Sequence, residues 1–342
     1  MTTEIGKDIN KAKEILSNGG LVAIPTETVY GLAANALAEN AIISVFETKG
    51  RPRFNPLILH VKSFSEAEKY AKNIPDIAYK IANEFMPGPI TFLLEKSDLV
   101  SDIVTAGSNL VAIRVPNHSL TLELLNSLDF PLVAPSANTF GYVSPTSAQH
   151  VKDNLGGKIP FILDGGECNV GIESTIIAFE VDNQGNYSIV VYRKGSFDLV
   201  QLEKFNIQIT EKVNNNNDNL SAPGRLNAHY SPNIKCMFGD ILELHTLVIN
   251  ANPKVKIAIL SFSKSYFDIS YIDKPCILDN VVINHILSPN SDLNEAAHNL
   301  FKELRELETF DEIDILLLEK VPNFGIGEAI NDRLERAAAK YL

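Results

Sequence analysis

The chain has 342 residues, of which 45% are hydrophobic and 21% charged, and its formal net charge is −12 at pH 7. At roughly 150 residues per domain this length predicts about two domains, and the apolar fraction suffices for a core in each. The acidic balance argues against a broad basic face for nucleic acid, and no apolar run approaches the roughly 20 residues of a membrane-spanning helix.

Hydrophobic periodicity divides most of the chain into helices and strands. Apolar residues at spacings of three and four predict helices, and short apolar runs bounded by turn residues predict strands. Gly19-Gly20 ends the first helix, and Gly50 stands at a C-cap position. In chain order we expect a helix beginning at Ile9, strand Leu21–Ile24, helix Asn40–Lys49, strand Leu57–Val61, helical patches Ser65–Lys72 and Pro75–Phe85, strands Ile90–Glu95 and Leu110–Val115, helix Ser119–Ser127, strand Leu132–Ala134, helix Thr146–Leu155, strand Ile159–Leu163, and strands Ser174–Glu180 and Ser188–Arg193 joined by a hairpin turn, Asp182–Asn186.

A run of four asparagines, Asn214–Asn217, indicates a linker, because it cannot bury a face. Beyond it, strand-like and helical runs alternate again, which predicts a smaller Rossmann-like α/β domain. We expect strands Val255–Leu260 and Ile313–Leu318, a long helix capped by Ser291 with an apolar stripe from Leu293 to Leu307, and a last helix Ala329–Tyr341. The predicted organisation is an α/β domain with a twisted mixed sheet over 1–208, a linker over 209–233 and the Rossmann-like domain over 234–342.

Polar loops that follow strands are the chemically distinctive feature of the first domain. The P-loop, the dinucleotide-binding glycine motif, the His-Glu-x-x-His zinc motif and the serine-hydrolase elbow are all absent from the sequence. In open α/β folds, ligands bind where such loops meet beyond the strand ends. The loops and strand ends that we single out are Pro25–Gly31, Lys49–Pro56, His60, Pro87-Gly88-Pro89, Arg114, Ala134–Asn138, Ser144-Pro145-Thr146, Gly171–Thr175 and Arg193-Lys194-Gly195.

Four cations in these segments, Lys49, Arg51, Arg114 and Arg193, suit a polyphosphate or a carboxylate. The residues therefore predict a small anionic ligand in a cationic pocket of an acidic protein, and they leave its identity open. Each residue also has a structural interpretation when taken alone: the arginines as solvated strand residues, Lys49 as a partner of the helix dipole, and His60 as a satisfied core histidine.

The set of motifs, in order and spacing, resembles the YrdC-type threonylcarbamoyl-AMP synthases over roughly Ile9 to Gly195. The linker and the C-terminal end resemble the longer, two-domain form of that family. The motifs that carry the resemblance are Pro25-Thr26-Glu27-Thr28-Val29-Tyr30-Gly31, Lys49-Gly50-Arg51-Pro52 with Asn55-Pro56-Leu57, Pro87-Gly88-Pro89, Ser136-Ala137-Asn138, Glu173-Ser174-Thr175, Pro223-Gly224, His229-Tyr230-x-Pro232 and Gly325–Leu334.

This resemblance implies that L-threonine, bicarbonate and ATP combine to give threonylcarbamoyl-AMP and pyrophosphate. The product would pass to a transferase complex that modifies the adenosine beside the anticodon of tRNA, and magnesium would accompany ATP. Carried over by position, Lys49 and Arg51 are the catalytic cations. The implied ATP ligands are Lys49, Arg51, Asn55, Leu110, Ser136, Asn138, Ser144, Arg193 and Tyr230, and the implied threonine ligands are Thr28, His60, Arg114, Ala134 and Ser174.

The linker departs from the family pattern between Gly224 and His229, where relatives often have further basic or aromatic residues. Here the stretch is Arg225-Leu226-Asn227-Ala228, so either Arg225 supplies the charge or the linker contacts ATP less. His229 and Tyr230 are kept, which is compatible with a lid role.

Two other functions remain to be weighed. A nucleic-acid-binding module of the same fold is disfavoured by the acidic balance, and a carbamoyltransferase of the hydrogenase-maturation type is disfavoured because only three scattered cysteines are present. The odd cysteine count and the polar N-terminus, which does not look like a signal peptide, favour a reducing compartment and a cytoplasmic location.

Overall fold

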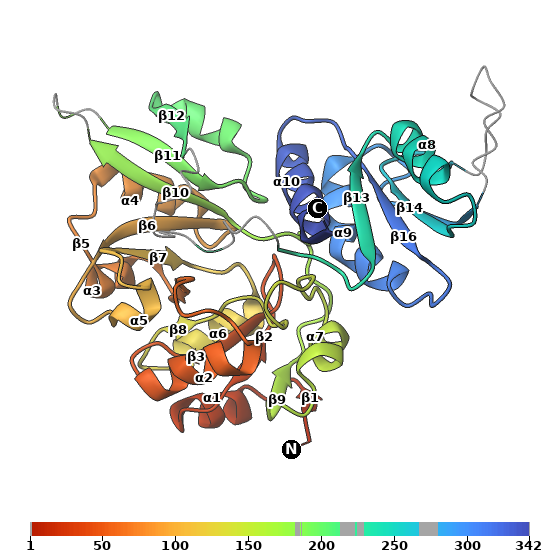
Figure 1. Ribbon diagram of the computed structural model, residues 1–342. Helices are drawn as coiled ribbons and strands as arrows, with labels where there is room; N and C mark the ends of the chain where they lie inside the picture. Colours follow the sequence, from red (N-terminus) through yellow and green to blue (C-terminus); the bar gives the residue numbers. More distant parts are fainter. Residues whose placement is uncertain are drawn as a thin grey trace. The chain divides into compact units, whose positions relative to one another are not determined.

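The computed structural model describes residues 2–181, 185, 187–212, 223, 229–266 and 280–341, which form two compact units (Figure 1). The first unit comprises residues 1–140 and 144–225, and the second comprises residues 141–143 and 226–342. The three residues Gly141–Val143 thus belong to the second unit, although the residues before and after them in the sequence belong to the first. Most of the expected turn Asp182–Asn186 and all of the asparagine run Asn214–Asn217 lie outside the described residues.

A twelve-stranded mixed sheet organises the first unit, in the order β1-β9-β2-β3-β8-β4-β7-β6-β10-β11-β12, with β5 paired to β6. Strand β4 runs parallel to β7 and antiparallel to β8, and β10 runs parallel to β6 and antiparallel to β11. The expected mixed α/β sheet is confirmed. Its strands are β1 (Glu4–Gly6), β2 (Val22–Ile24), β3 (Gly31–Asn35), β4 (Ile58–His60), β5 (Ala71–Lys72), β6 (Ile90–Lys96), β7 (Leu110–Arg114), β8 (Leu132–Val133), β9 (Phe161–Leu163), β10 (Thr175–Val181), β11 (Tyr187–Arg193) and β12 (Gln208–Glu211).

Alternating side chains of the central strands build apolar clusters on both faces of this sheet. Val22 and Ile24 pack with α1 and α6, whereas Ala23 and Leu32 join the larger cluster that includes α2 and α4. Helix α2 ends at Gly50, which takes the left-handed conformation (φ 62°) expected of a C-cap glycine. The helices are α1 (Ile9–Ser17), α2 (Glu39–Lys49), α3 (Ala67–Tyr70), α4 (Asp76–Phe85), α5 (Asp102–Thr105), α6 (Ser119–Ser127) and α7 (Ala148–Leu155), with 3-10 turns η1 (Phe64–Glu66) and η2 (Leu199–Phe205).

The expected helical patch Ser65–Lys72 is wrong only in its last two residues, Ala71 and Lys72. The chain there forms η1, then α3, and then β5, because Ala71 becomes extended and pairs with Lys96 of β6. Strand β3 was not expected, since its sequence Gly-Leu-Ala-Ala-Asn has little strand propensity. It forms because β2 and β8 flank it on both sides.

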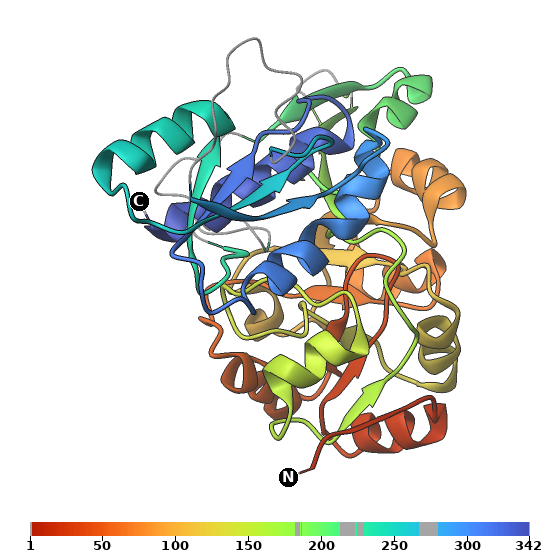
Figure 2. The same ribbon diagram turned by 90° about the vertical axis from the view of Figure 1, so that its right-hand side faces the viewer.

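A four-stranded parallel sheet of order β13-β16-β14-β15 forms the second unit, which confirms the Rossmann-like prediction (Figure 1). Its helices, in teal and blue in Figure 2, lie along this sheet. None of the helices in the described ranges has the length and hydrophobicity that a membrane span requires. The elements are β13 (Lys235–Gly239), α8 (Ile241–Ala251), β14 (Ile257–Ser261), β15 (Val281–Ile286), α9 (Leu293–Leu307), β16 (Ile315–Glu319), α10 (Ile326–Ala338) and the 3-10 turn η4 (Ala339–Tyr341).

The cap of helix α9 differs from the expectation. Asp292, not Ser291, is the N-cap, and its carboxylate accepts a hydrogen bond from the Asn294 backbone N–H at 2.7 Å. Ser291 has a positive φ of 59°, which removes it from the extended conformation that an N-cap adopts. The apolar stripe from Leu293 to Leu307 is confirmed as core, with Leu300 and Phe301 fully buried.

Candidate functional site

Buried charge in the first unit gathers at the segments that the sequence singles out. A charged side chain is costly to bury unless a partner or a ligand offsets it. Four cations against two carboxylates leave an excess of positive charge, which suits an anionic ligand. Within the described part of this unit, the buried charged side chains are Glu27, Lys49, Arg51, Arg114, Glu173 and Arg193.

The loop Pro25–Gly31 connects several of these segments through its backbone. Tyr30 donates its N–H to the Pro145 carbonyl at 2.8 Å and accepts from the Ala137 N–H at 2.8 Å. The Glu27 carbonyl accepts from the Val170 N–H at 2.8 Å. The loops around residues 25–31, 134–138, 144–146 and 168–175 therefore converge, as expected for a site beyond strand ends.

Lys49, the last residue of α2, reaches the loop after β8. Its Nζ donates to the Ser136 carbonyl oxygen at 2.5 Å and also to the Asn138 carbonyl oxygen. Burial, and then the neighbouring Arg51, hold the pKa of Lys49 well below its usual range. An anion bound beside these two cations would raise the Lys49 pKa again, because a nearby negative charge stabilises the protonated amine.

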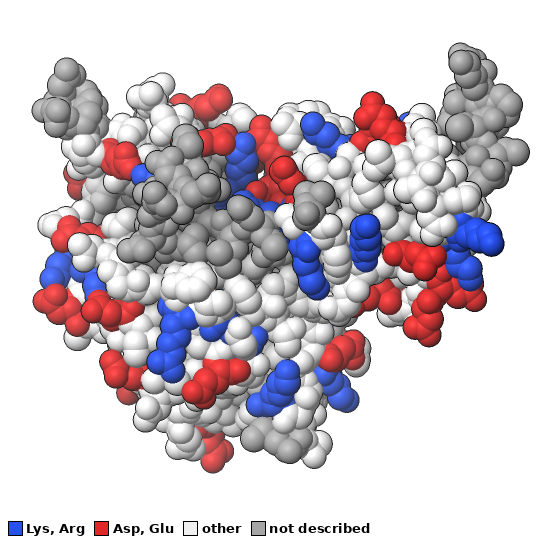
Figure 3. Space-filling view, viewed as in Figure 1, with Lys and Arg blue, Asp and Glu red and all other residues white. Residues whose placement is uncertain are grey.

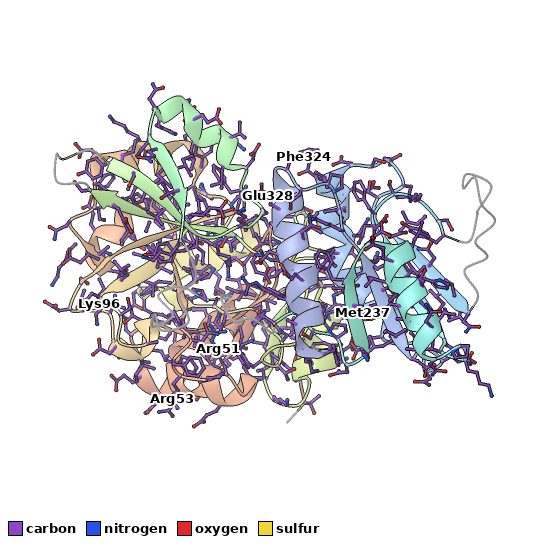
Figure 4. All side chains as sticks on the ribbon, turned by 45° about the horizontal axis from the view of Figure 1, so that its top comes forward. Arg51, Arg53, Lys96, Met237, Phe324 and Glu328 are labelled. Atoms are coloured by element: carbon purple, nitrogen blue, oxygen red, sulfur yellow. The ribbon has the colours of Figure 1, made fainter. Side chains whose placement is uncertain are left out.

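The turn after Gly50 places Arg51 and Asn55 together. Arg51 donates from Nε to the Asn55 carbonyl oxygen at 3.2 Å and from Nη2 to the Pro56 carbonyl oxygen at 2.8 Å. The Asn55 side chain is fully buried, and neither its oxygen nor its nitrogen has a hydrogen-bond partner among the described residues. A buried amide without a partner points to a ligand that completes it. Arg53, for which the sequence predicts no role, is exposed (Figure 4).

Arg193, at the end of β11, is bound to the residue that precedes β10. Its Nε and Nη2 donate to the Ser174 carbonyl oxygen at 3.1 and 2.9 Å, and Nη2 also donates to the Ser174 hydroxyl at 3.1 Å. The same hydroxyl lies 2.8 Å from the Thr91 hydroxyl of β6. A guanidinium fork therefore fixes Ser174 between two strands.

Ser144 is paired with a carboxylate that the sequence analysis did not assign. Its hydroxyl donates to Glu173 Oε1 at 2.6 Å, and the Glu173 carbonyl accepts from the Ser196 N–H at 3.0 Å. Glu173 lies within the motif Glu173-Ser174-Thr175. The sequence did not predict it as a ligand residue, because a carboxylate repels an anion.

Arg114 and His60 are register partners at the ends of the parallel strands β7 and β4. Arg114 Nη2 donates to the Thr28 hydroxyl at 3.0 Å and lies 2.8 Å from Glu27 Oε1. His60 Nδ1 lies 3.2 Å from the Ile58 carbonyl oxygen. Burial, and then the Arg114 charge, lower the pKa of His60 to about 3, so its imidazole is neutral at physiological pH.

Three predicted ligand residues remain to be placed, namely Ala134, Leu110 and Tyr230. Ala134 donates its N–H to the Ile58 carbonyl oxygen at 3.3 Å, beside His60. Leu110 begins β7, at the opposite end of that strand from Arg114, roughly 13 Å away at the usual rise per residue. Tyr230 belongs to the second unit, and its ATP contact stays a prediction.

Within the second unit, Tyr230 is part of an aromatic group. Its ring stacks on Phe301 with centroids 5.5 Å apart, and the Arg333 guanidinium lies 5.4 Å from its centroid. The His229 ring meets the Tyr230 ring edge-on at 4.1 Å. The lid role expected of these two residues stays a prediction, and Arg225–Ala228 lie outside the described residues.

The segment Gly141–Val143, which stands between Asn138 and Ser144 in the sequence, is held by the second unit. The Tyr142 hydroxyl donates to Glu308 at 2.5 Å, and its ring lies 4.8 Å beneath the Arg305 guanidinium. Arg305 also donates to the Val143 carbonyl oxygen. Arg305 of α9 and Glu308, the C-cap of that helix, thus hold the segment between two predicted nucleotide ligands, Asn138 and Ser144.

One group of potential metal ligands occurs within the described residues, and it lies in the second unit. Ligand atoms of His285, Glu303 and Glu306 all lie within 4.8 Å of one another. His285 Nδ1 already lies 2.5 Å from Glu303 Oε2, so a hydrogen bond accounts for these two side chains without a metal.

The comparisons with known proteins cover both units. A family described as "Telomere recombination" matches residues 14–195, and one described as "Threonylcarbamoyl-AMP synthase, C-terminal domain" matches residues 198–339. The threonylcarbamoyl-AMP synthase of Pyrococcus abyssi is 37% identical over 333 residues, covering 96% of this chain and 94% of the relative. That of Bacillus subtilis is 34% identical over 340 residues, covering 96% and 92%. The crystal structure of P. abyssi Sua5 complexed with L-threonine matches with a TM-score of 0.85 at 35% identity, covering 100% of this chain and 98% of that one.

Proposed function

Because the chain belongs to the two-domain threonylcarbamoyl-AMP synthase family, we propose that its buried site joins L-threonine, bicarbonate and ATP. The enzyme is a nucleotidyltransferase whose product is threonylcarbamoyl-AMP. The observation that carries the proposal is that all buried charges of the first unit, within its described residues, lie in the loops and strand ends that the sequence singles out.

The proposed chemistry needs no protein nucleophile. The threonine amine combines with bicarbonate to give a carbamate and water. A carbamate oxygen then attacks the α-phosphorus, the new O–P bond forms, and the bond to the bridging oxygen breaks to release pyrophosphate. The protein has to hold two anionic reactants together and stabilise the charge that develops on the leaving group. Buried cations in a site with little water are suited to both tasks.

ATP is assigned to the residues around Lys49. The Arg51 charge is near enough to Lys49 to lower its pKa, which supports placing both cations beside the same anion. Asn55 brings a buried amide without a protein partner. Ser136, Asn138, Ser144 and Arg193 complete this part of the proposal, and Leu110 and Tyr230 belong to it only through the family resemblance.

Threonine is assigned to the strand ends around Arg114. The P. abyssi relative was crystallised with L-threonine, and the match covers 98% of its chain. The Arg114 guanidinium suits the carboxylate, while Thr28, His60 and Ser174 offer neutral hydrogen-bonding groups and Ala134 a backbone carbonyl.

Magnesium is proposed to accompany ATP. The ion would be held mainly by phosphate oxygens and would neutralise phosphate charge. The cytoplasmic location and the transfer of the product to a tRNA-modifying complex belong to the same proposal.

Direct nucleic-acid binding is not favoured. In Figure 3, basic and acidic side chains alternate over the visible face without a broad basic area. The four cations that are predicted to bind the substrates are buried instead.

Mass detection of threonylcarbamoyl-AMP tests the proposal directly. The purified protein should form this product only when threonine, bicarbonate and ATP are all present. Arg51→Ala and Arg114→Ala should each lower pyrophosphate release about 10- to 100-fold, because each removes a charged partner of one substrate. Arg53→Ala, a change at the exposed arginine of the same loop, should leave the rate unchanged. Turnover that persists in both Arg51→Ala and Arg114→Ala would show that the pocket is misassigned.

A further inference from the structure

Glu27 is a buried carboxylate that the proposed function does not use. It stands in the loop between β2 and β3, and the whole residue is 6% exposed. One oxygen lies 2.8 Å from Arg114 Nη2, but neither carboxylate oxygen has a hydrogen bond of good geometry among the described residues. Arg114 Nε also lacks a partner there. A carboxylate can accept about four hydrogen bonds, so most of the capacity of Glu27 is unused.

The position of Glu27 conflicts with a site built for a carboxylate alone. Arg114 is the predicted partner of the threonine carboxylate, and a second carboxylate 2.8 Å from it would repel that group. The conflict disappears if the ligand is a zwitterion. Glu27 and Arg114 together are neutral, and a zwitterionic amino acid laid against them in the opposite direction pairs each charge with its opposite.

We propose that Glu27 binds the α-ammonium group of the amino acid substrate and makes the site specific for zwitterions. This inference rests on the proposed function and adds a specificity-determining residue to it. Thr28 supports the geometry, because its hydroxyl accepts from Arg114 Nη2 at 3.0 Å and thereby fixes the guanidinium beside Glu27. The backbone of Glu27 is fixed too, through the hydrogen bond from the Val170 N–H.

The test compares two ligands that differ in one group. L-threonine and 2,3-dihydroxybutanoate of matching configuration share the carboxylate and the β-hydroxyl, but the second has a neutral hydroxyl in place of the ammonium. Calorimetric titration without ATP should show that the wild-type protein binds threonine about 10- to 100-fold more tightly, the usual effect of one charged hydrogen bond. In Glu27→Gln, threonine binding should fall by about that factor while the hydroxy acid changes less than about threefold.

A purely structural role for Glu27 predicts a different pattern. If Glu27 only orients Arg114, Glu27→Gln weakens both ligands equally, because both use the carboxylate contact, and the inference is overturned. Unchanged threonine binding in that variant overturns it as well. Glu27→Asp keeps the charge on a shorter side chain and should retain part of the discrimination, which gives a second decision if Glu27→Gln does not fold by circular dichroism.

The test of Glu27 can fail while the test of the proposed function succeeds, because the two tests measure different properties. Titration without ATP reports on the amino acid site alone, whereas synthesis of threonylcarbamoyl-AMP reports on the reaction. Product formation by the wild-type protein together with equal losses for both ligands would leave the function standing and remove Glu27 from the site.

Discussion

Buried His60 makes the stability of the first unit fall at acidic pH. The residue ends β4, is 2% exposed and lies beside Arg114 in the register of the sheet. Its pKa falls from 6.5 to about 3, chiefly because burial disfavours the charged form and secondly because Arg114 repels a proton. The unfolded chain therefore binds a proton below pH 6.5 that the folded chain does not bind.

The sign and size of the effect follow by linkage. Stability is fully present above pH 6.5 and falls as the pH drops from 6.5 towards 3, since protons then favour the unfolded state. Each pH unit in this window is worth about 1.4 kcal/mol. At pH 4.5, two units below the unfolded value, His60 alone should cost about 3 kcal/mol.

His60→Asn isolates this contribution. Asparagine does not titrate, and its amide nitrogen can still donate to the Ile58 carbonyl oxygen. Urea unfolding at pH 8 and at pH 4.5 should show that the wild-type protein loses about 3 kcal/mol more than the variant over this interval. Other groups titrate in both proteins, so the difference between the two losses belongs to His60.

His118→Asn is the matched control. This histidine is only partly buried, and although burial lowers its pKa, Gly165 and Glu27 act in the opposite direction. Its replacement should change the pH dependence less than that of His60. Identical pH dependence of the wild-type protein and His60→Asn would refute the argument from burial.

Two glycine substitutions test the packing around the site, and an alkylation experiment tests the burial of two cysteines. In Gly195→Ala the new methyl would lie 2.3 Å from the Ser174 carbonyl carbon, so the backbone must move, and we expect about 1–3 kcal/mol loss in urea unfolding together with weaker threonine binding in calorimetry. Gly107→Ala, where only the positive φ of 80° is strained and space is open, should lose stability without affecting threonine. Burial raises the pKa of Cys168 and Cys236 to about 12, so iodoacetamide at pH 8 should alkylate both in urea but neither in the native protein, as read by mass spectrometry. Rapid labelling of either thiol in the native protein would contradict that burial.

Elements with a strong local signal could be predicted from the sequence, and elements made by their neighbours could not. The stripe of α9 marks one face of a helix, and its buried residues are the ones that the spacing indicates. Strand β3 depends on pairing with β2 and β8, which no local pattern encodes. Helix α8 was missed although Asp240 caps it and accepts from two backbone N–H groups, a signal that the sequence does contain.

In the candidate site, the cations could be predicted from the sequence, but the buried acids could not. All four predicted cations, Lys49, Arg51, Arg114 and Arg193, are buried in the first unit. The two buried acids were not assigned, because a carboxylate in an anion-binding pocket makes sense only once its partner is known. Glu27 beside Arg114 and Glu173 beside Ser144 supply those partners in three dimensions.

The segment Gly141–Val143 affects how the gene for this protein can be shortened. A chain that ends before the linker keeps Tyr142 and Val143 but loses Arg305 and Glu308, which hold them. Tyr142 and Val143, in the loop between Asn138 and Ser144, would then lose their contacts with Glu308 and Arg305. Removing the C-terminal unit therefore calls for redesign of this loop in the same step, with small polar residues in place of the aromatic anchor.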